Sequence, residues 1–162
     1  MKKIFALLSL IILFFSGCKT LEPTSVTRHS SFKGYKYVYI TPTSEKTSVS
    51  GAVVGGKYGV YGGTESKSVN PSDLISGHFL KRGFIKLPEI IPENIDQTII
   101  VNYGETKSEY DGFYYYEGVI IQIISAKTND IICVGVSEER GDKEAKALLK
   151  AINKCVEEIF NE

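Results

Sequence analysis

The sequence predicts an α+β protein, a two-layer α/β sandwich built on a mixed sheet of four to five strands, with two helices on one face and a glycine-rich hairpin insertion. Several runs rich in β-branched and aromatic residues are typical of strands. Two stretches with apolar residues at three-four spacing are typical of amphipathic helices. The composition, 162 residues with 43% hydrophobic residues and zero formal net charge, fits one globular domain and excludes a wholly disordered chain.

The first predicted strand covers residues 35–40, where Tyr35, Tyr37 and Tyr39 alternate with Val38 and Ile40. Successive strand side chains point to opposite faces, so the three tyrosines are expected on one face, away from the helices. Tyrosine combines a large contact area with a polar tip, which makes this face a candidate partner-binding surface. The alternative is an ordinary half-exposed strand face, or one covered by the insertion.

The insertion is an arm over residues 43–69, whose centre reads SGAVVGGKYGVYGG. Short β-prone pieces around Gly55-Gly56 predict a hairpin. An isolated hairpin is marginal in water, so the arm is expected to lie on its own sheet, on a second copy or on a partner. Tyr58 and Tyr61 therefore join the candidate partner-binding residues.

Two helices and four further strands follow the arm. Asn70 is a good N-cap, Pro71 suits the first helical position, and Gly83 suits the left-handed cap at the other end. Strands are predicted over residues 84–87, 98–103, 115–125 and 130–138, and a polar loop is predicted over residues 104–112. The strand over 115–125 is apolar on both faces, so we expect it to be central.

Asp142 is the predicted N-cap of the last helix, which shows the clearest periodicity in the chain. Its apolar stripe consists of Ala145, Leu148, Leu149, Ile152, Cys155, Val156, Ile159 and Phe160. This stripe is expected to cover the sheet, with lysines and glutamates on the other side.

No cofactor, metal site or catalytic group is predicted. Residues 51–57 match the first seven positions of a phosphate-binding loop, but Tyr58 stands where a hydroxyl should bind magnesium and no helix follows, so no nucleotide is expected. His29 and His78, the two histidines, have no serine nucleophile in a suitable context. Balanced charge gives no footprint for nucleic acid.

Cys133 and Cys155 lie in buried apolar patterns. We expect free core thiols, with a disulfide between them as the alternative left open for an exported chain.

Four acidic residues surround the predicted loop over 104–112: Glu105, Glu109, Asp111 and Glu117. Their spacing is not that of a calcium-binding loop, so a solvated loop is the favoured interpretation. A carboxylate pair for glycan hydrolysis stays open as an alternative.

The N-terminus predicts export and a lipid anchor. Lys2 and Lys3 precede an apolar run over residues 4–15, which is shorter than the roughly 20 residues needed to cross a bilayer. The run ends in Ser16-Gly17-Cys18, which resembles the lipobox of bacterial lipoproteins. This resemblance implies a signal peptide over residues 1–17, acylation of Cys18, including palmitate, and a flexible lipidated tether over residues 18–33, followed by one domain over 34–162.

Lys19 follows the cysteine, so the aspartate that retains some lipoproteins in the inner membrane is absent. By the same resemblance, the anchor belongs in the outer membrane, on the periplasmic face, with surface display left open. The element order, the lipobox and the lysine-rich last helix resemble small, uncharacterised envelope lipoproteins of Gram-negative bacteria. Their α/β domain is similar to the N-terminal domain of the Tol-system β-propeller protein and to outer-membrane activators of peptidoglycan synthases.

That resemblance covers about residues 35–160 and implies a non-enzymatic interaction or scaffold module that binds an envelope protein. Two alternatives stay open. One is an envelope hydrolase acting on glycan or peptide, and the other is a structural subunit that forms a homo-oligomer through the glycine-rich arm.

Overall fold

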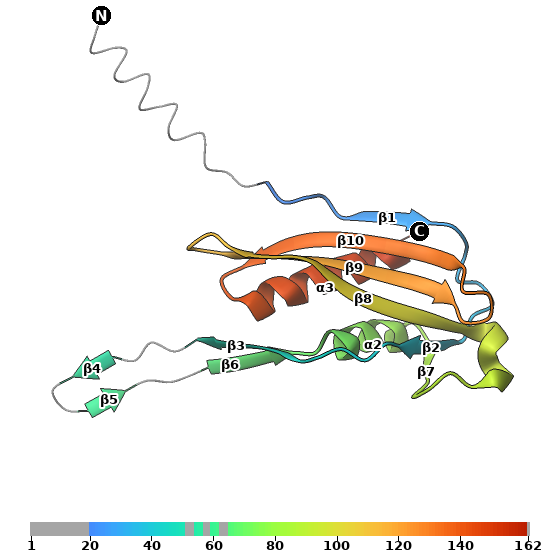
Figure 1. Ribbon diagram of the computed structural model, residues 1–162, viewed down its shortest axis with the longest axis horizontal. Helices are drawn as coiled ribbons and strands as arrows, with labels where there is room; N and C mark the ends of the chain where they lie inside the picture. Colours follow the sequence, from blue (N-terminus) through green and yellow to red (C-terminus); the bar gives the residue numbers. More distant parts are fainter. Residues whose placement is uncertain (1–19, 51–53, 57–58, 62–64, 162) are drawn as a thin grey trace, which may run out of the picture.

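The computed structural model describes residues 20–50, 54–56, 59–61 and 65–161 (Figure 1). Its main sheet has six strands: β1 (Ser25–Arg28), β2 (Tyr37–Ile40), β7 (Ile85–Lys86), β8 (Thr98–Tyr110), β9 (Tyr115–Ser125) and β10 (Ile131–Gly141). Their order is β1-β10-β9-β8-β2-β7. The predicted α+β class is confirmed. The sheet exceeds the expected four to five strands because the tether contributes the extra edge strand β1.

The centre of the sheet is antiparallel and one edge is parallel. β9 pairs with β8 on one side and β10 on the other, as its apolar faces predict. β2 runs parallel to both β8 and β7. The buried residues of β2, β8, β9 and β10 that join the core alternate with outward-facing ones, so one face of the sheet carries the core.

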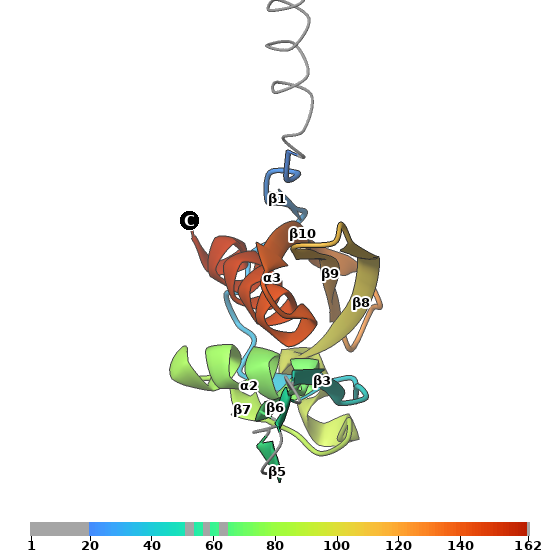
Figure 2. The ribbon, with the colours of Figure 1, turned by 90° about the vertical axis from the view of Figure 1, so that its left-hand side faces the viewer.

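Both helices pack on that core. α2 (Pro71–Lys81) begins as predicted: the Asn70 side chain accepts a hydrogen bond from the backbone N–H of Ser72, at 3.0 Å. Gly83, at φ +86°, follows its last turn, where only glycine adopts the backbone without strain. α3 (Glu144–Phe160) lies against β9 and β10, and α2 lies beside it (Figure 2).

The predicted stripe of α3 is confirmed, but its predicted N-cap is wrong. The cap position is Lys143, with extended backbone and no capping side chain. The Asp142 carboxylate instead pairs with the Lys146 ammonium one turn later, at 2.9 Å. Glycine at position 141 lets the end of β10 lie close to the first turn of α3, because a β-carbon there would lie 2.7 Å from the backbone nitrogen of Ala147.

The prediction that residues 18–33 form a flexible tether is wrong for Ser25–Arg28. This segment is β1, which pairs antiparallel with β10 along its whole length. The Arg28 guanidinium donates to the backbone oxygens of Ile159, at 2.6 Å, and Asn161, at 2.8 Å, at the end of α3. A cation at a helix C-terminus is favourable, so this contact fixes β1 to the domain.

The predicted polar loop over residues 104–112 is also wrong. β8 continues to Tyr110 and pairs with β9 up to Tyr115, with one irregularity between Glu105 and Lys107. Polar side chains line most of this half of the hairpin. A 3-10 helix, η1 (Pro92–Gln97), leads into β8.

The glycine-rich insertion forms two short antiparallel ladders. β3 (Lys46–Ser50) pairs with β6 (Glu65–Val69), and β4 (Val54–Gly56) pairs with β5 (Gly59–Tyr61). Figure 1 shows β4 and β5 beyond the ends of β3 and β6, away from the main sheet. A hairpin over the predicted arm is thus confirmed for the described backbone, and we call residues 43–69 the arm.

The predicted signal peptide, Cys18 and Tyr58 lie outside the described residues. Within the part of the chain that is described, no helix has both the length and the apolar character to span a membrane.

Candidate functional site

The structure separates the three tyrosines of the predicted docking face. Tyr37 and Tyr39 alternate with the buried Val38 and Ile40 and are half-buried on the face opposite the helices. Tyr35 precedes β2 and packs against the core instead. The outer face therefore holds two of the three, and Tyr61 is described only as backbone in β5.

Polar side chains continue this outer face across the sheet. The Thr41 hydroxyl donates to the Asn102 side-chain oxygen at 2.7 Å, and Asn102 lies opposite Gln122 in the ladder of β8 and β9. A shallow depression of about 270 Å³ lies between Asn102, Ile120 and Gln122. This is a mixed polar and apolar surface, as a partner-binding face requires, without deep enclosure.

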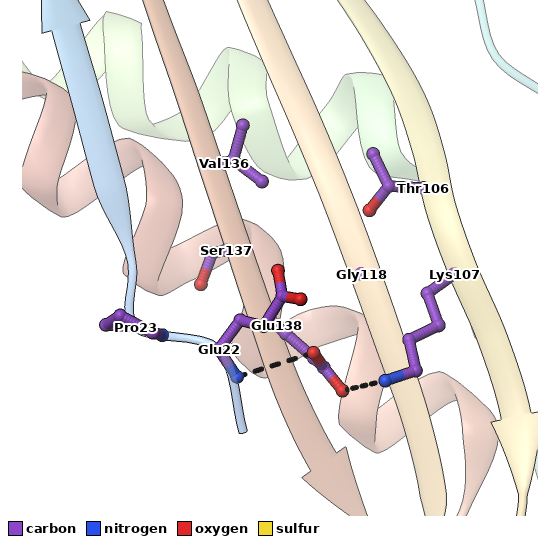
Figure 3. A pocket seen from close by; sticks show the side chains of 8 residues that line it. All are labelled: Glu22, Pro23, Thr106, Lys107, Gly118, Val136, Ser137 and Glu138. Carbon is purple, nitrogen blue, oxygen red and sulfur yellow. Dashed lines mark hydrogen bonds and ion pairs between the residues drawn. The ribbon is translucent and has the colours of Figure 1, made fainter. Parts of the chain in front are cut away.

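A smaller recess lies on the main sheet near the start of β1 (Figure 3). Its volume is about 180 Å³, and its lining comprises Glu22, Pro23, Thr106, Lys107, Gly118, Val136, Ser137 and Glu138. The Lys107 ammonium and the buried Glu138 carboxylate are 2.6 Å apart. That hydrogen bond to Glu138 raises the pKa of Lys107, although partial burial opposes it.

The recess joins the N-terminal segment to the sheet. The backbone N–H of Glu22 donates to the other Glu138 oxygen at 3.4 Å, and the hydroxyls of Thr24 and Ser137 lie 2.9 Å apart. Glu138 thus bridges Lys107 of β8 and the chain that leads back to the N-terminus. Because the Lys107 ammonium and the buried Glu138 carboxylate already pair with each other, the recess serves mainly to hold the N-terminal segment against the sheet.

A second charged cluster lies at the base of the arm. The Lys46 ammonium pairs with Glu105 at 2.5 Å and with Glu144 at 3.4 Å, so it ties β3 to β8 and to the start of α3. Burial opposes its charge, but the two carboxylates outweigh this and raise the pKa of Lys46.

Glu117 lies on β9 beside this cluster and is fully buried. One oxygen accepts from the Ser108 hydroxyl at 2.8 Å, and the other has no hydrogen-bond partner among the described residues. Burial raises the pKa of this carboxyl, while Ser108 and the Lys46 charge act in the opposite direction. A raised carboxyl pKa suits a general acid, but a side chain with no exposed surface offers no access to a glycan or peptide.

The four acidic residues of the predicted loop do not form one group. Glu105 pairs with Lys46, Glu117 is enclosed in the sheet, and Asp111 accepts from two backbone N–H groups of its own turn. Among the described residues, no group of three or more histidine, cysteine, aspartate or glutamate side chains could hold a metal ion.

Cys133 and Cys155 are buried and unbridged, facing each other from β10 and α3. Burial raises the pKa of both thiols, and that of Cys155 reaches about 12. Such thiols are weak nucleophiles and fill the core as small apolar groups.

Sequence reasoning missed the turn between β8 and β9, where Phe113 is 82% exposed and Tyr110 and Tyr114 are exposed as well. The run Phe113-Tyr114-Tyr115-Tyr116, directly after Asp111 and Gly112, could have indicated it. Four consecutive aromatic residues after a turn signal are unusual for a solvated loop.

Comparisons with known proteins show a similar fold in solved structures. No protein-family model matches the chain, and neither does any curated protein. A PelC dodecamer from Paraburkholderia phytofirmans is 9% identical and has a TM-score of 0.51, over 85% of this chain and 96% of that one. A point variant of that dodecamer is also 9% identical, with a TM-score of 0.52, over 83% of this chain and 96% of that one. At this identity the likeness supports the fold alone.

Proposed function

We propose that this chain is a lipoprotein of the bacterial envelope, anchored to the outer membrane through lipid on Cys18, and that it works as a non-enzymatic interaction module. The observation that carries the interaction role is the arm. It is a β-hairpin clamped at its base by Lys46, and its outer ladder lies beyond the main sheet. Strands presented in this way pair readily with another chain.

The geometry gives less support to the hydrolase alternative. The one carboxyl with a raised pKa, among the carboxyl groups described, is buried beside α3, and in the recess of Figure 3 the Glu138 carboxylate is already paired with Lys107. The Cys18 anchor rests on the sequence at residues 1–18.

Self-assembly through the arm is the second candidate. It is favoured by the fold's likeness to PelC, whose solved structures are dodecamers. A second copy and a different envelope protein would both pair with the outer ladder of β4 and β5, and the deletion described next separates them.

The test removes residues 48–66 and joins the ends with a short glycine-serine linker. Because β3 and β6 pair chiefly with each other, the remaining domain should still fold, with the helical signal of its far-ultraviolet spectrum retained and a cooperative thermal transition. It should lose its association, measured as mass by light scattering for self-assembly and by co-purification from the native envelope for a partner. Failure of the shortened chain to fold would place the arm in the core, and unchanged association would make it a dispensable loop.

The anchor has its own test. Intact-mass analysis of the protein from the membrane fraction should show acyl groups on a chain that begins at Cys18. A Cys18→Ser variant should keep its signal peptide and carry no acyl mass, and an unmodified wild-type chain would refute the anchor.

A further inference from the structure

The turn between β8 and β9, residues 110–115, is here called the hairpin tip. Three exposed aromatic side chains lie within it: Phe113 at 82% exposure, Tyr110 at 56% and Tyr114 at 44%. Clustered exposed apolar side chains mark a contact site far more often than scattered ones do.

The hairpin tip is an ordered structure. One Asp111 oxygen accepts from the backbone N–H groups of Phe113, at 2.8 Å, and Tyr114, at 2.7 Å, while the other accepts from the Tyr116 hydroxyl at 2.9 Å. The rings of Tyr110 and Tyr115 are tilted against each other with centroids 4.6 Å apart. A rigid tip loses little conformational entropy when it binds.

The N-terminal segment leaves the sheet toward this same tip. Ser25 lies opposite Val136, and Glu22 reaches Glu138, so the chain traced back from Arg28 follows β10 toward its end. That end, Gly141, pairs with Tyr115 at the base of the tip. Figure 1 shows the described chain before β1 running toward the end of the molecule where β8 and β9 turn.

Chain length allows the anchor to reach the level of the tip. Gly118 lies beside Glu138, and Tyr115 is three positions further along β9, or about 10 Å toward the tip. Cys18 precedes Glu22 by four positions, so it lies within about 14 Å of Glu22. A lipid surface that holds Cys18 is therefore within reach of the aromatic rings.

We propose that the hairpin tip contacts the surface of the lipid bilayer that holds the acyl chains of Cys18. This inference rests on the proposed lipidation. Phenylalanine and tyrosine suit the boundary between headgroups and acyl chains, where the ring is buried and the hydroxyl stays hydrated. With the anchor and the tip both at the membrane, the far end of the sheet, where β9 turns into β10, faces away from the lipid.

The experiment uses the absence of tryptophan from the whole sequence. Phe113→Trp places one fluorophore at the tip, at a site exposed enough to tolerate it. The matched control is Ile131→Trp, which is 41% exposed at the opposite end of β10. Full chains from the membrane fraction are checked for acyl mass and reconstituted in vesicles of phosphatidylethanolamine and phosphatidylglycerol, with and without bromine in the acyl chains.

Bromine should reduce the emission of F113W about two-fold or more and leave that of I131W within about a tenth, because only the tip enters the interface. Acylated protein with unquenched F113W would overturn the contact and leave the proposed anchor standing. Absence of acyl mass would refute the anchor and, with it, this orientation. Equal quenching of F113W and I131W would also overturn the inference. So would an F113W emission that iodide cannot quench in the absence of lipid and that bromine does not reduce, because a protein surface then covers the tip.

Discussion

Two hairpins extend from this domain, and they are built in different ways. The hairpin of β8 and β9 is continuous with the six-stranded sheet, carries core residues on one face, and ends in a turn tied by Asp111. The arm pairs mainly with itself and is joined to the domain at its base by Lys46. Packed apolar side chains make the hairpin of β8 and β9 rigid. The arm is rich in glycine and therefore has few side chains that can pack. Core residues that stabilise the domain therefore lie in the first hairpin, and our proposal assigns pairing with another protein chain to the second.

The largest effect is expected in the core half of the rigid hairpin. Ile121 is fully buried between Tyr103 and Gly135 on the neighbouring strands. Ile121→Ala should lower the free energy of unfolding by about 2–5 kcal/mol, because it leaves a cavity. Urea denaturation measures this, and the same titration on the chain lacking residues 48–66 should show a change of about 1 kcal/mol or less. A larger loss of unfolding free energy from the arm deletion than from I121A would contradict the view that the hairpin of β8 and β9 stabilises the domain more than the arm does.

The irregularity in β8 should give the next effect. A β-carbon on Gly118 would lie 2.5 Å from the Thr106 hydroxyl and 3.0 Å from the Lys107 β-carbon. Gly118→Ala should therefore cost about 1–3 kcal/mol of unfolding free energy by overpacking. The matched control is Gly77→Ala inside α2, where no atom lies within 4 Å, and which should stabilise by about 0.5–1 kcal/mol. Equal behaviour of the two variants in thermal denaturation would contradict the close packing.

Glu117 makes the rigid hairpin sensitive to pH. Burial raises its pKa in the folded protein above the ordinary carboxyl value of 4.5, so the folded state binds the proton more tightly. Its contribution to stability is fully present below the unfolded pKa and is lost as the pH rises through the folded pKa. Glu117→Gln imitates the protonated form, so wild type should become less stable relative to E117Q over that window. Parallel stability curves from urea titrations between acid and neutral pH would refute this.

The smallest effect on stability is expected at the base of the arm. The Lys46 side chain is 29% exposed, and its ammonium pairs with the carboxylates of two side chains that are also partly accessible. Lys46→Gln should cost about 0–1 kcal/mol, and the difference should disappear at about 1 M salt, where exposed pairs are screened. A large, salt-independent loss in chemical denaturation would mean that the arm is an integral part of the domain.

Local signals in the sequence predicted the central elements well. Asn70 and Pro71 fixed the start of α2, the apolar stripe fixed α3, and the two-sided apolar run marked β9 as central. These features depend on neighbours within a few residues, which the sequence displays directly.

The elements that the sequence did not predict form through pairing with strands that are distant in the sequence. Ser25–Arg28 is short and mostly polar, and it is a strand only because β10 offers an open edge. The second half of β8 is polar as well, and it is held by pairing with β9 rather than by a core of its own. Tyr35 fits the alternating sequence pattern of Tyr37 and Tyr39, but its side chain packs against the core. It lies before β2 begins, directly after the turn at Gly34, so the alternation of the strand does not apply to it.

The antiparallel pairing of β1 with β10 has a mechanical consequence. Tension from an anchor at Cys18 would pull β1 along its own axis, from Ser25, while Arg28 holds the far end of the strand on α3. All the ladder hydrogen bonds are then loaded together in shear, instead of one after another as in a zipper. The domain would follow the movements of the membrane as a rigid load, and pulling on the N-terminus in a force spectrometer should require more force than peeling β1 from its Arg28 end.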